Sequence, residues 1–152
     1  MKTKALILTA AMIVLGMATQ AKATEPVLDG HYRMDLKIGD RVFVDQLDLR
    51  GEGQPLSLRS FVGPIAGLVT VPGIFSSALT GQGQCSEKTS SCTFDFVIVA
   101  HEGGQDYKVL YHAELTPENY LKALSGKNPP VLSGAASLED GQVLGPFEAI
   151  KQ

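Results

Sequence analysis

Asp45 is the residue of this sequence whose position is most suggestive of chemistry. It lies in the stretch RVFVDQLDL, residues 41–49, in which polar and apolar residues alternate as in a half-buried β-strand. If this stretch pairs with residues 31–38 across a turn at Gly39, Asp45 falls opposite Met34, on the apolar face. A buried carboxylate must find hydrogen-bond donors, take up a proton or hold a ligand.

Three tyrosines are expected on the same inner face and could donate to this carboxylate: Tyr32, Tyr107 and Tyr111. The functional interpretation is a small ligand-binding pocket with aromatic walls and with Asp45 as its polar anchor. The structural interpretation, which we prefer from the sequence alone, is a core Asp whose oxygens accept from a Tyr hydroxyl or from backbone amides, or a bulge that turns the side chain outward.

The three histidines fall on the outer face of the expected strands, each opposite a carboxylate. The pairs are His31 with Asp48, His101 with Asp106, and His112 with Asp95. Cross-strand charge pairs of this kind stabilise a sheet by about 0.2 to 1 kcal/mol each. A metal site would need a third ligand beside one of these pairs, and the pattern supplies none. We therefore expect neither a metal nor a cofactor.

Cys85 and Cys92 are the only cysteines, and they flank a polar, turn-prone segment. In an exported protein such a pair is expected to form a disulfide. The alternative is a redox or metal-binding pair, which usually has the closer C-x-x-C spacing.

Motifs of common enzyme classes are absent. The sequence contains no Gly-x-Ser-x-Gly elbow, no HExxH pair, no glycine-rich phosphate loop and no C-x-x-C. Glu102 and Glu139 could form a carboxylate pair only if the fold brought their turns together. We therefore predict that the protein is not an enzyme.

Three hairpins are predicted where alternation and turn residues coincide. Gly39-Asp40 separates residues 31–38 from 41–49, Gly103-Gly104 separates 92–102 from 105–115, and Asp140-Gly141 separates 131–139 from 142–150. In the third hairpin this register places Leu138 opposite Val143.

The remaining elements are read from local signals. Residues 75–83 are expected to pair with the strand that contains Phe94, and residues 56–61 to form another strand. One short helix is predicted over residues 117–124, because Thr116 can cap it and Pro117 suits its first position. Residues 63–73, GPIAGLVTVPG, are either a bent strand or an apolar loop.

The N-terminus has the pattern of a secretory signal peptide. Lys2 and Lys4 precede an apolar run over residues 5–15, and Ala21-Lys22-Ala23 supplies a small-x-small cleavage site. We predict cleavage after Ala23, leaving one domain over residues 24–152 in the periplasm or outside the cell. The apolar run is shorter than the ~20 residues of a membrane anchor.

Cleavage also changes the charge. It removes three of the 13 basic residues and none of the 16 acidic ones, so the net charge of the mature chain is about −6. Nucleic acids and anionic lipid surfaces bind clustered Lys and Arg, so neither is expected as a partner.

About eight strands joined to their sequence neighbours predict an all-β, antiparallel up-and-down barrel, with a two-sheet sandwich as the alternative. An exported meander whose first strand opens with Gly30-His31-Tyr32 resembles the calycin group of lipocalin and avidin-type barrels. Lipocalins have Trp where Tyr32 stands. The resemblance concerns architecture alone and implies no functional residue, and biotin binding is not implied because the chain has no Trp.

Several apolar residues are expected on the outer face, where another surface would cover them. They are Val97, Val99 and Leu110, with Val42 and Val44 on the first hairpin. The short helix could cover the first group with Tyr120, Leu121 and Leu124; otherwise a second copy or a partner protein would. Two functions follow: a barrel that binds a small, partly apolar molecule, or a noncatalytic structural or interaction module of the cell envelope, as monomer or homodimer.

Overall fold

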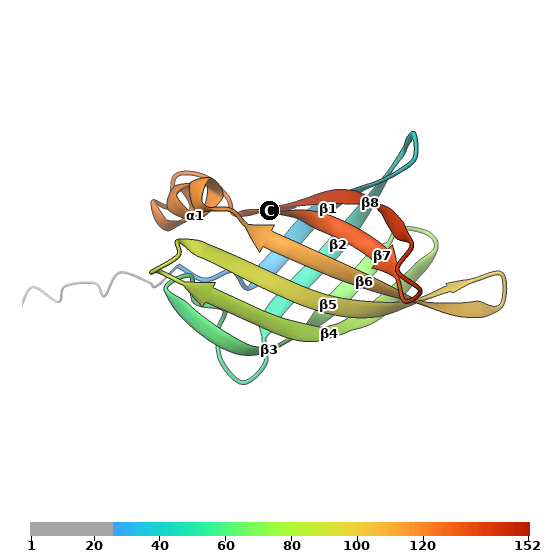
Figure 1. Cartoon of the computed structure of the whole chain (residues 1–152), viewed down its shortest axis with the longest axis horizontal. Helices are drawn as coiled ribbons and strands as arrows, with labels where there is room; N and C mark the ends of the chain where they lie inside the picture. Colours follow the sequence, from blue (N-terminus) through green and yellow to red (C-terminus); the bar gives the residue numbers. More distant parts are fainter. Residues whose placement is uncertain (1–25) are drawn as a thin grey trace, which may run out of the picture.

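The computed structural model describes residues 26–152, in which eight antiparallel strands form a closed barrel with one helix at its end (Figure 1). The strands are β1 (Gly30–Ile38), β2 (Arg41–Gly51), β3 (Ser60–Val71), β4 (Phe75–Ser86), β5 (Ser91–Glu102), β6 (Gln105–Leu115), β7 (Val131–Leu138) and β8 (Val143–Lys151), and the helix is α1 (Pro117–Leu124). Each strand pairs with its sequence neighbour, and β8 pairs with β1 to close the sheet. The barrel prediction is confirmed, and the sandwich alternative is wrong.

The first two predicted hairpins have the expected register. In β1 and β2, Met34 pairs with Asp45 and Ile38 with Arg41. In β5 and β6, Glu102 pairs with Gln105 across Gly103-Gly104. Both glycines of that turn have positive φ, 60° and 77°, which a two-residue hairpin turn of this type requires and which side chains other than glycine rarely adopt.

The third hairpin differs from its prediction near the turn. Gly134 pairs with Phe147 and Ala136 with Gly145 as expected, but the register then shifts, and Ser137 pairs with Val143. The loop is longer than a two-residue turn, because the Leu138 amide donates to the Gln142 carbonyl at 2.8 Å. Leu138 therefore does not face Val143, which lies outward and 68% exposed.

The strand predicted over residues 56–61 is wrong in its position, since the strand β3 begins at Ser60. Residues 63–73, left open between strand and loop, lie in β3 as far as Val71. Leu56 and Leu58 precede β3 in a loop, and both are buried. Their apolar character reflects packing at the end of the barrel rather than a place in the sheet.

Inward glycines allow close approach of strands and rings. A Cβ on Gly83 would lie 2.7 Å from Cδ1 of Phe94, so the Phe94 ring fills that space. A Cβ on Gly81 would lie 2.6 Å from Cα of Phe96 on β5. In this part of the barrel the small residues accommodate the core rather than leave a void.

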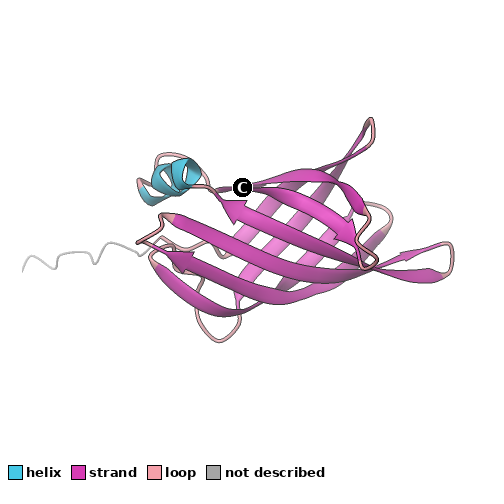
Figure 2. Ribbon diagram, in the orientation of Figure 1, coloured by secondary structure: helices cyan, strands magenta, loops and turns pink. Residues whose placement is uncertain are grey.

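One end of the barrel is closed by α1 and by the loops around it (Figure 2). Thr116 caps the helix as predicted, accepting from the Asn119 amide at 3.4 Å. Tyr120 is fully buried, and its hydroxyl donates to the Leu58 carbonyl at 2.8 Å. The helix thus packs on the end of the barrel and does not cover the outward Leu110, which remains 42% exposed.

The segment before β1 also packs at this end, where the Leu28 amide donates to the Leu56 carbonyl at 2.8 Å. The predicted signal peptide and the cleavage after Ala23 lie outside the described residues. Within residues 26–152, no helix is long and apolar enough to cross a membrane.

A disulfide joins Cys85 and Cys92, as predicted. The two residues pair directly between β4 and β5, beside the turn that connects these strands. Both half-cystines are buried and belong to the apolar core, at the end of the barrel that α1 closes. The disulfide therefore fastens the β4–β5 hairpin at its tip.

Candidate ligand-binding site

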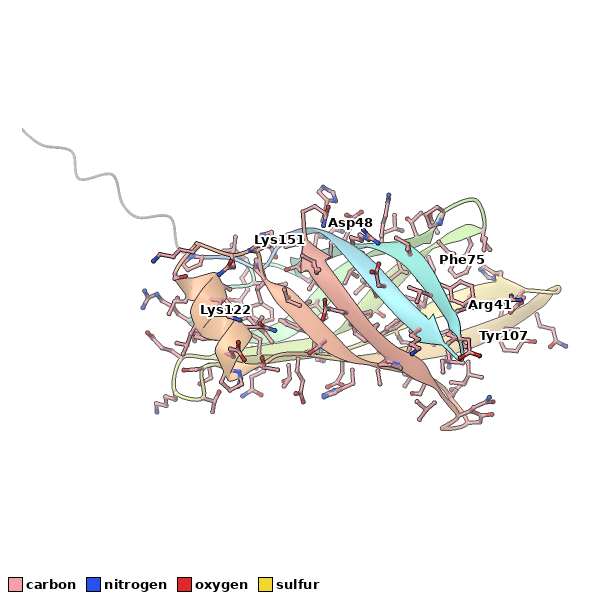
Figure 3. The ribbon with its side chains drawn as sticks, turned by 90° about the horizontal axis from the view of Figure 1, so that it is seen from above. Arg41, Asp48, Phe75, Tyr107, Lys122 and Lys151 are labelled. Carbon is pink, nitrogen blue, oxygen red and sulfur yellow. A yellow bond between two sulfur atoms is a disulfide. The ribbon has the colours of Figure 1, made fainter. Side chains whose placement is uncertain are left out.

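The end of the barrel opposite α1 contains a cavity of about 360 Å³, which we call the cup. This end is formed by the four hairpins β1–β2, β3–β4, β5–β6 and β7–β8. In Figure 3, Phe75, Arg41 and Tyr107 mark this hairpin end, while Lys122 and Lys151 lie toward the helix end. The cup volume is within the range of about 300 to 1,000 Å³ that is usual for small-molecule sites.

All eight strands contribute to the cup. Its walls are mainly apolar and aromatic: Leu36, Ile38, Phe43, Val71, Phe75, Ile98, Ala100, Val109, Leu138 and Leu144. The rim carries Ile74, His101, Glu102 and Tyr107, and two polar side chains lie deeper, Asp45 and Tyr111. An apolar recess with few polar groups is the usual composition of a site for a small, partly apolar molecule.

Asp45 faces inward from β2 because its strand alternates without a bulge. Its neighbours on the inner face, Leu47 and Leu49, are buried, as is Met34 across the ladder. Asp45 itself is only 2% exposed. It is the one charged side chain buried in the core of the described barrel.

The carboxyl group of Asp45 has no hydrogen-bond donor among the described residues, and its Oδ1 is completely enclosed. The structural interpretation required a donor or a bulge at this position. The structure has no such donor, and the β1–β2 register is continuous through Asp45, so there is no bulge either. A buried polar atom without a partner is rare in native proteins and calls for an explanation.

The environment of Asp45 raises the pKa of its carboxyl group to about 6. Burial is the main cause, since it disfavours the charged form, and the negative charge of Asp35 adds to it. Asp35 lies on the outer face of β1, where Arg33 donates to it at 3.0 Å. This pKa lies below 7, so at neutral pH the ionised form predominates and its negative charge lies inside the barrel.

Tyr111 is the tyrosine that lies in the cup with Asp45 and is affected by its charge. Its ring stacks on Phe96 with 4.9 Å between centroids and meets Phe147 edge-on at 5.5 Å. Burial and the charge of Asp45 both raise the pKa of its hydroxyl, so it is a neutral phenol. That hydroxyl has no hydrogen-bond partner among the described residues, and its ring is fixed by the packing.

The hydroxyl groups of the other two candidate tyrosines donate elsewhere than to Asp45. Tyr107 lines the rim, 39% exposed, and its hydroxyl donates to Gln105 at 2.8 Å. Tyr32 lies outside the cup, toward the closed end, and donates to the Leu28 carbonyl at 2.6 Å. Burial and Asp29 raise the pKa of Tyr32, which keeps this hydroxyl a donor. The predicted set of one carboxyl and three tyrosines is thus divided between the two ends.

Sequence reasoning missed two residues that shape the cup. Ile74 lies in the turn between β3 and β4, where alternation gives no inner face. Leu144 was assigned to the outer face by the register of the third hairpin, and the register shift near Ser137 turns it inward. Phe43 shares the inner face of Asp45, as alternation predicts, and lines the cup.

The outward histidine–carboxylate pairs are confirmed. His31 pairs with Asp48 and His101 with Asp106. His112 lies 2.6 Å from Asp95 and 3.1 Å from Glu114, and its hydrogen bonds to these two carboxylates raise its pKa. In the part of the chain that the structure describes, no group of three such side chains could hold a metal ion.

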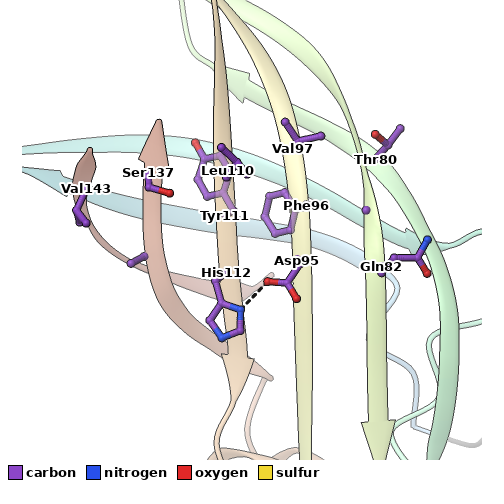
Figure 4. A pocket seen from close by; sticks show the side chains of 12 residues that line it. Thr80, Gln82, Asp95, Phe96, Val97, Leu110, Tyr111, His112, Ser137 and Val143 are labelled. Atoms are coloured by element: carbon purple, nitrogen blue, oxygen red, sulfur yellow. Dashed lines mark hydrogen bonds and ion pairs between the residues drawn. The ribbon is translucent and has the colours of Figure 1, made fainter. Parts of the chain in front are cut away.

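A second depression lies on the outer wall over β4 to β8, lined by Val97, Leu110 and Val143 beside the His112–Asp95 pair (Figure 4). Leu110 and Val143 are 42% and 68% exposed. Unlike the cup, this surface contains no buried polar group without a partner, so it has less to orient a small ligand.

The two glutamates considered as a carboxylate pair have separate surroundings. Glu102 lies at the rim of the cup, whereas Glu139 accepts from Lys108 at 3.0 Å.

Comparisons of the chain with protein-family models, with curated proteins and with solved structures found no match. A function must therefore be inferred from the geometry and the charge of the cup.

Proposed function

We propose that this protein is an exported, noncatalytic barrel that binds a small, partly apolar molecule in the cup. One observation supports the proposal most: an apolar cavity of about 360 Å³ has a buried carboxyl without a partner in its lining. A buried charge without donors destabilises the folded state. A role in binding gives a reason for it, because strained or unsatisfied groups concentrate at functional sites.

The architecture is compatible with this role. An eight-stranded barrel is just wide enough to be filled by side chains or to hold one small ligand, and this barrel combines a packed half with an open half. The proposal is that the ligand binds in the mouth of a calycin-like barrel. A calycin-like architecture is consistent with the closed antiparallel meander.

Export is part of the proposal. The N-terminal pattern of residues 1–23 and the Cys85–Cys92 disulfide both fit an oxidising compartment such as the periplasm or the exterior. Mass spectrometry of the protein recovered outside the cytoplasm should give a mature chain that begins at Thr24. Recovery of an uncleaved chain from the cytoplasm would contradict this part of the proposal.

The binding function can be tested with N-phenyl-1-naphthylamine, a dye that is neutral at pH 7.5 and fluoresces in apolar surroundings. Ala100→Trp places a large ring in the cup, because Ala100 lines it. Val44→Trp is the matched control, since Val44 lies on the outer face and is 47% exposed. We expect at least a tenfold loss of dye affinity in the first variant and little change in the second.

Circular dichroism would establish that both variants fold. Equal dye binding by the folded Ala100→Trp variant and the wild type, or no binding by the wild type, would contradict a ligand in the cup.

A role in protein interaction is the second candidate, and the outer-wall depression favours it. Leu110 and Val143 expose apolar surface there. Light scattering at high protein concentration tests for a homodimer, and Leu110→Lys should dissociate one that uses this surface. If the wild type and Leu110→Lys are both monomeric, self-association gives this candidate no support.

A further inference from the structure

The lining of the cup contains two carboxyl groups, Asp45 and Glu102, but neither Lys nor Arg among its sixteen residues. Its one histidine, His101, lies at the rim, where it already pairs with Asp106. From this asymmetry we propose that the ligand is a small amphipathic amine, whose ammonium group pairs with Asp45 while its apolar part lies against the aromatic walls. The inference rests on the proposed binding function and specifies the chemical class of the ligand.

No basic side chain among residues 26–152 neutralises Asp45. The nearest candidates in β1 and β2 are Arg33, Lys37 and Arg41, which are all exposed. Arg33 is also bound to Asp35 on the outer face. The partner for the buried charge must therefore come from outside the chain, or the charge remains unpaired.

An ammonium group satisfies this carboxylate better than other ligand groups. It offers three N–H donors and a positive charge, and charge-assisted hydrogen bonds are roughly twice as strong as neutral ones. Rotation about the Asp45 Cβ–Cγ bond, which is a broad torsion, can turn either oxygen toward the cup. The unpartnered hydroxyl of Tyr111 provides a second acceptor in the lining of the cup.

The aromatic walls suit the remainder of such a molecule. Phe43, Phe75 and Tyr107 line the cup together with Tyr111. Their faces are negative and attract a cation, and their carbon surfaces bury an alkyl or aryl group.

The same charges select against other amphiphiles. A fatty acid would place its carboxylate in a low-dielectric cavity with Asp45 and without a counter-charge, which is strongly unfavourable. A neutral alcohol could donate one hydrogen bond to Asp45 but would leave the charge itself unpaired. The expected order of affinity is amine, then alcohol, then carboxylate.

The test compares octylamine, octanol and octanoate as competitors for the dye at pH 7.5, with the folded wild-type protein. The three compounds have the same alkyl chain and differ in the head group. Octylamine should bind at least tenfold more tightly than octanol, and octanoate more weakly than either. Asp45→Asn should remove the preference for the amine while octanol affinity changes less than twofold.

Asp48→Asn is the matched control, because it removes the same charge from the outer face of the same strand, where Asp48 pairs with His31. The amine preference should survive in it. Equal displacement by octylamine and octanol, or an amine preference that persists in Asp45→Asn, would overturn the inference while leaving the cup as a binding site. A wild type that binds neither the dye nor any of the three compounds would contradict the proposed function itself.

Discussion

Replacing Asp45 with Asn should stabilise the barrel relative to the wild type, and this gain in the free energy of unfolding should be larger at neutral pH than at acid pH. The cause is the environment of the carboxyl group in the folded state. Burial raises its pKa from the ordinary value of 3.8 to about 6, so the folded protein holds the proton more tightly than the unfolded chain does. Asn keeps the size and shape of the side chain but cannot ionise.

The sign follows from proton linkage. Below about pH 3.8 the carboxyl is protonated in both states and has no electrostatic cost. As the pH rises from about 4 to 6, the unfolded chain releases the proton first, so the free energy of unfolding falls; above about pH 6 it levels off. A pKa difference of about 2 corresponds to about 3 kcal/mol, which the wild type loses and Asp45→Asn does not.

Urea denaturation followed by circular dichroism at pH 3.5 and pH 7.0 measures this difference. The stability of Asp45→Asn minus that of the wild type should increase by about 3 kcal/mol between the two pH values. A constant effect of the amide, such as an unsatisfied N–H, cancels in the comparison. Asp48→Asn should show no comparable increase. The same difference at both pH values would mean that Asp45 has a partner in the folded state, and the reasoning about the cup would fail.

Three further changes test how the packed half is held. Replacing both Cys85 and Cys92 with Ser should lower the free energy of unfolding by about 2 to 3 kcal/mol, measured by urea denaturation without reductant. Tyr120→Phe should lower it by about 1 kcal/mol or more in the same assay, because the buried Leu58 carbonyl loses its donor. Gly81→Ala should destabilise the fold by about 1 to 3 kcal/mol, seen as a lower thermal midpoint, because its Cβ would collide with the β5 backbone.

Much of the barrel could be predicted because local signals agreed. The first two hairpins combine strict alternation with a glycine turn, so register and inner face followed together. The prediction for the third hairpin is wrong between Ser137 and the turn, because a register shift changes the pairing of these residues without any mark in the side-chain pattern. Closure into a barrel depends on the pairing of β1 with β8, a long-range contact that strand order alone does not specify.

The site was harder to predict than the fold. Alternation assigned Asp45 to the inner face correctly, but it gives no height along the barrel axis. Tyr32 pairs with Leu47, toward the closed end, whereas Tyr107 pairs with Ala100 near the hairpin tips. Sharing a face was therefore not enough to bring these tyrosines to the carboxyl. The absence of a donor for Asp45 is a property of side-chain geometry, which sequence spacing does not determine.

The contrast between the two ends of the barrel gives the best reason to regard Asp45 as functional. At the closed end, the buried hydroxyls of Tyr32 and Tyr120 each donate to a backbone carbonyl. Toward the hairpin end, a charged group that costs more to bury has no donor. A chain that satisfies weaker polar groups in one half could have replaced Asp45 with Leu in the other at a gain in stability. A buried carboxylate beside an open apolar cavity is what selection for binding a cationic ligand would produce.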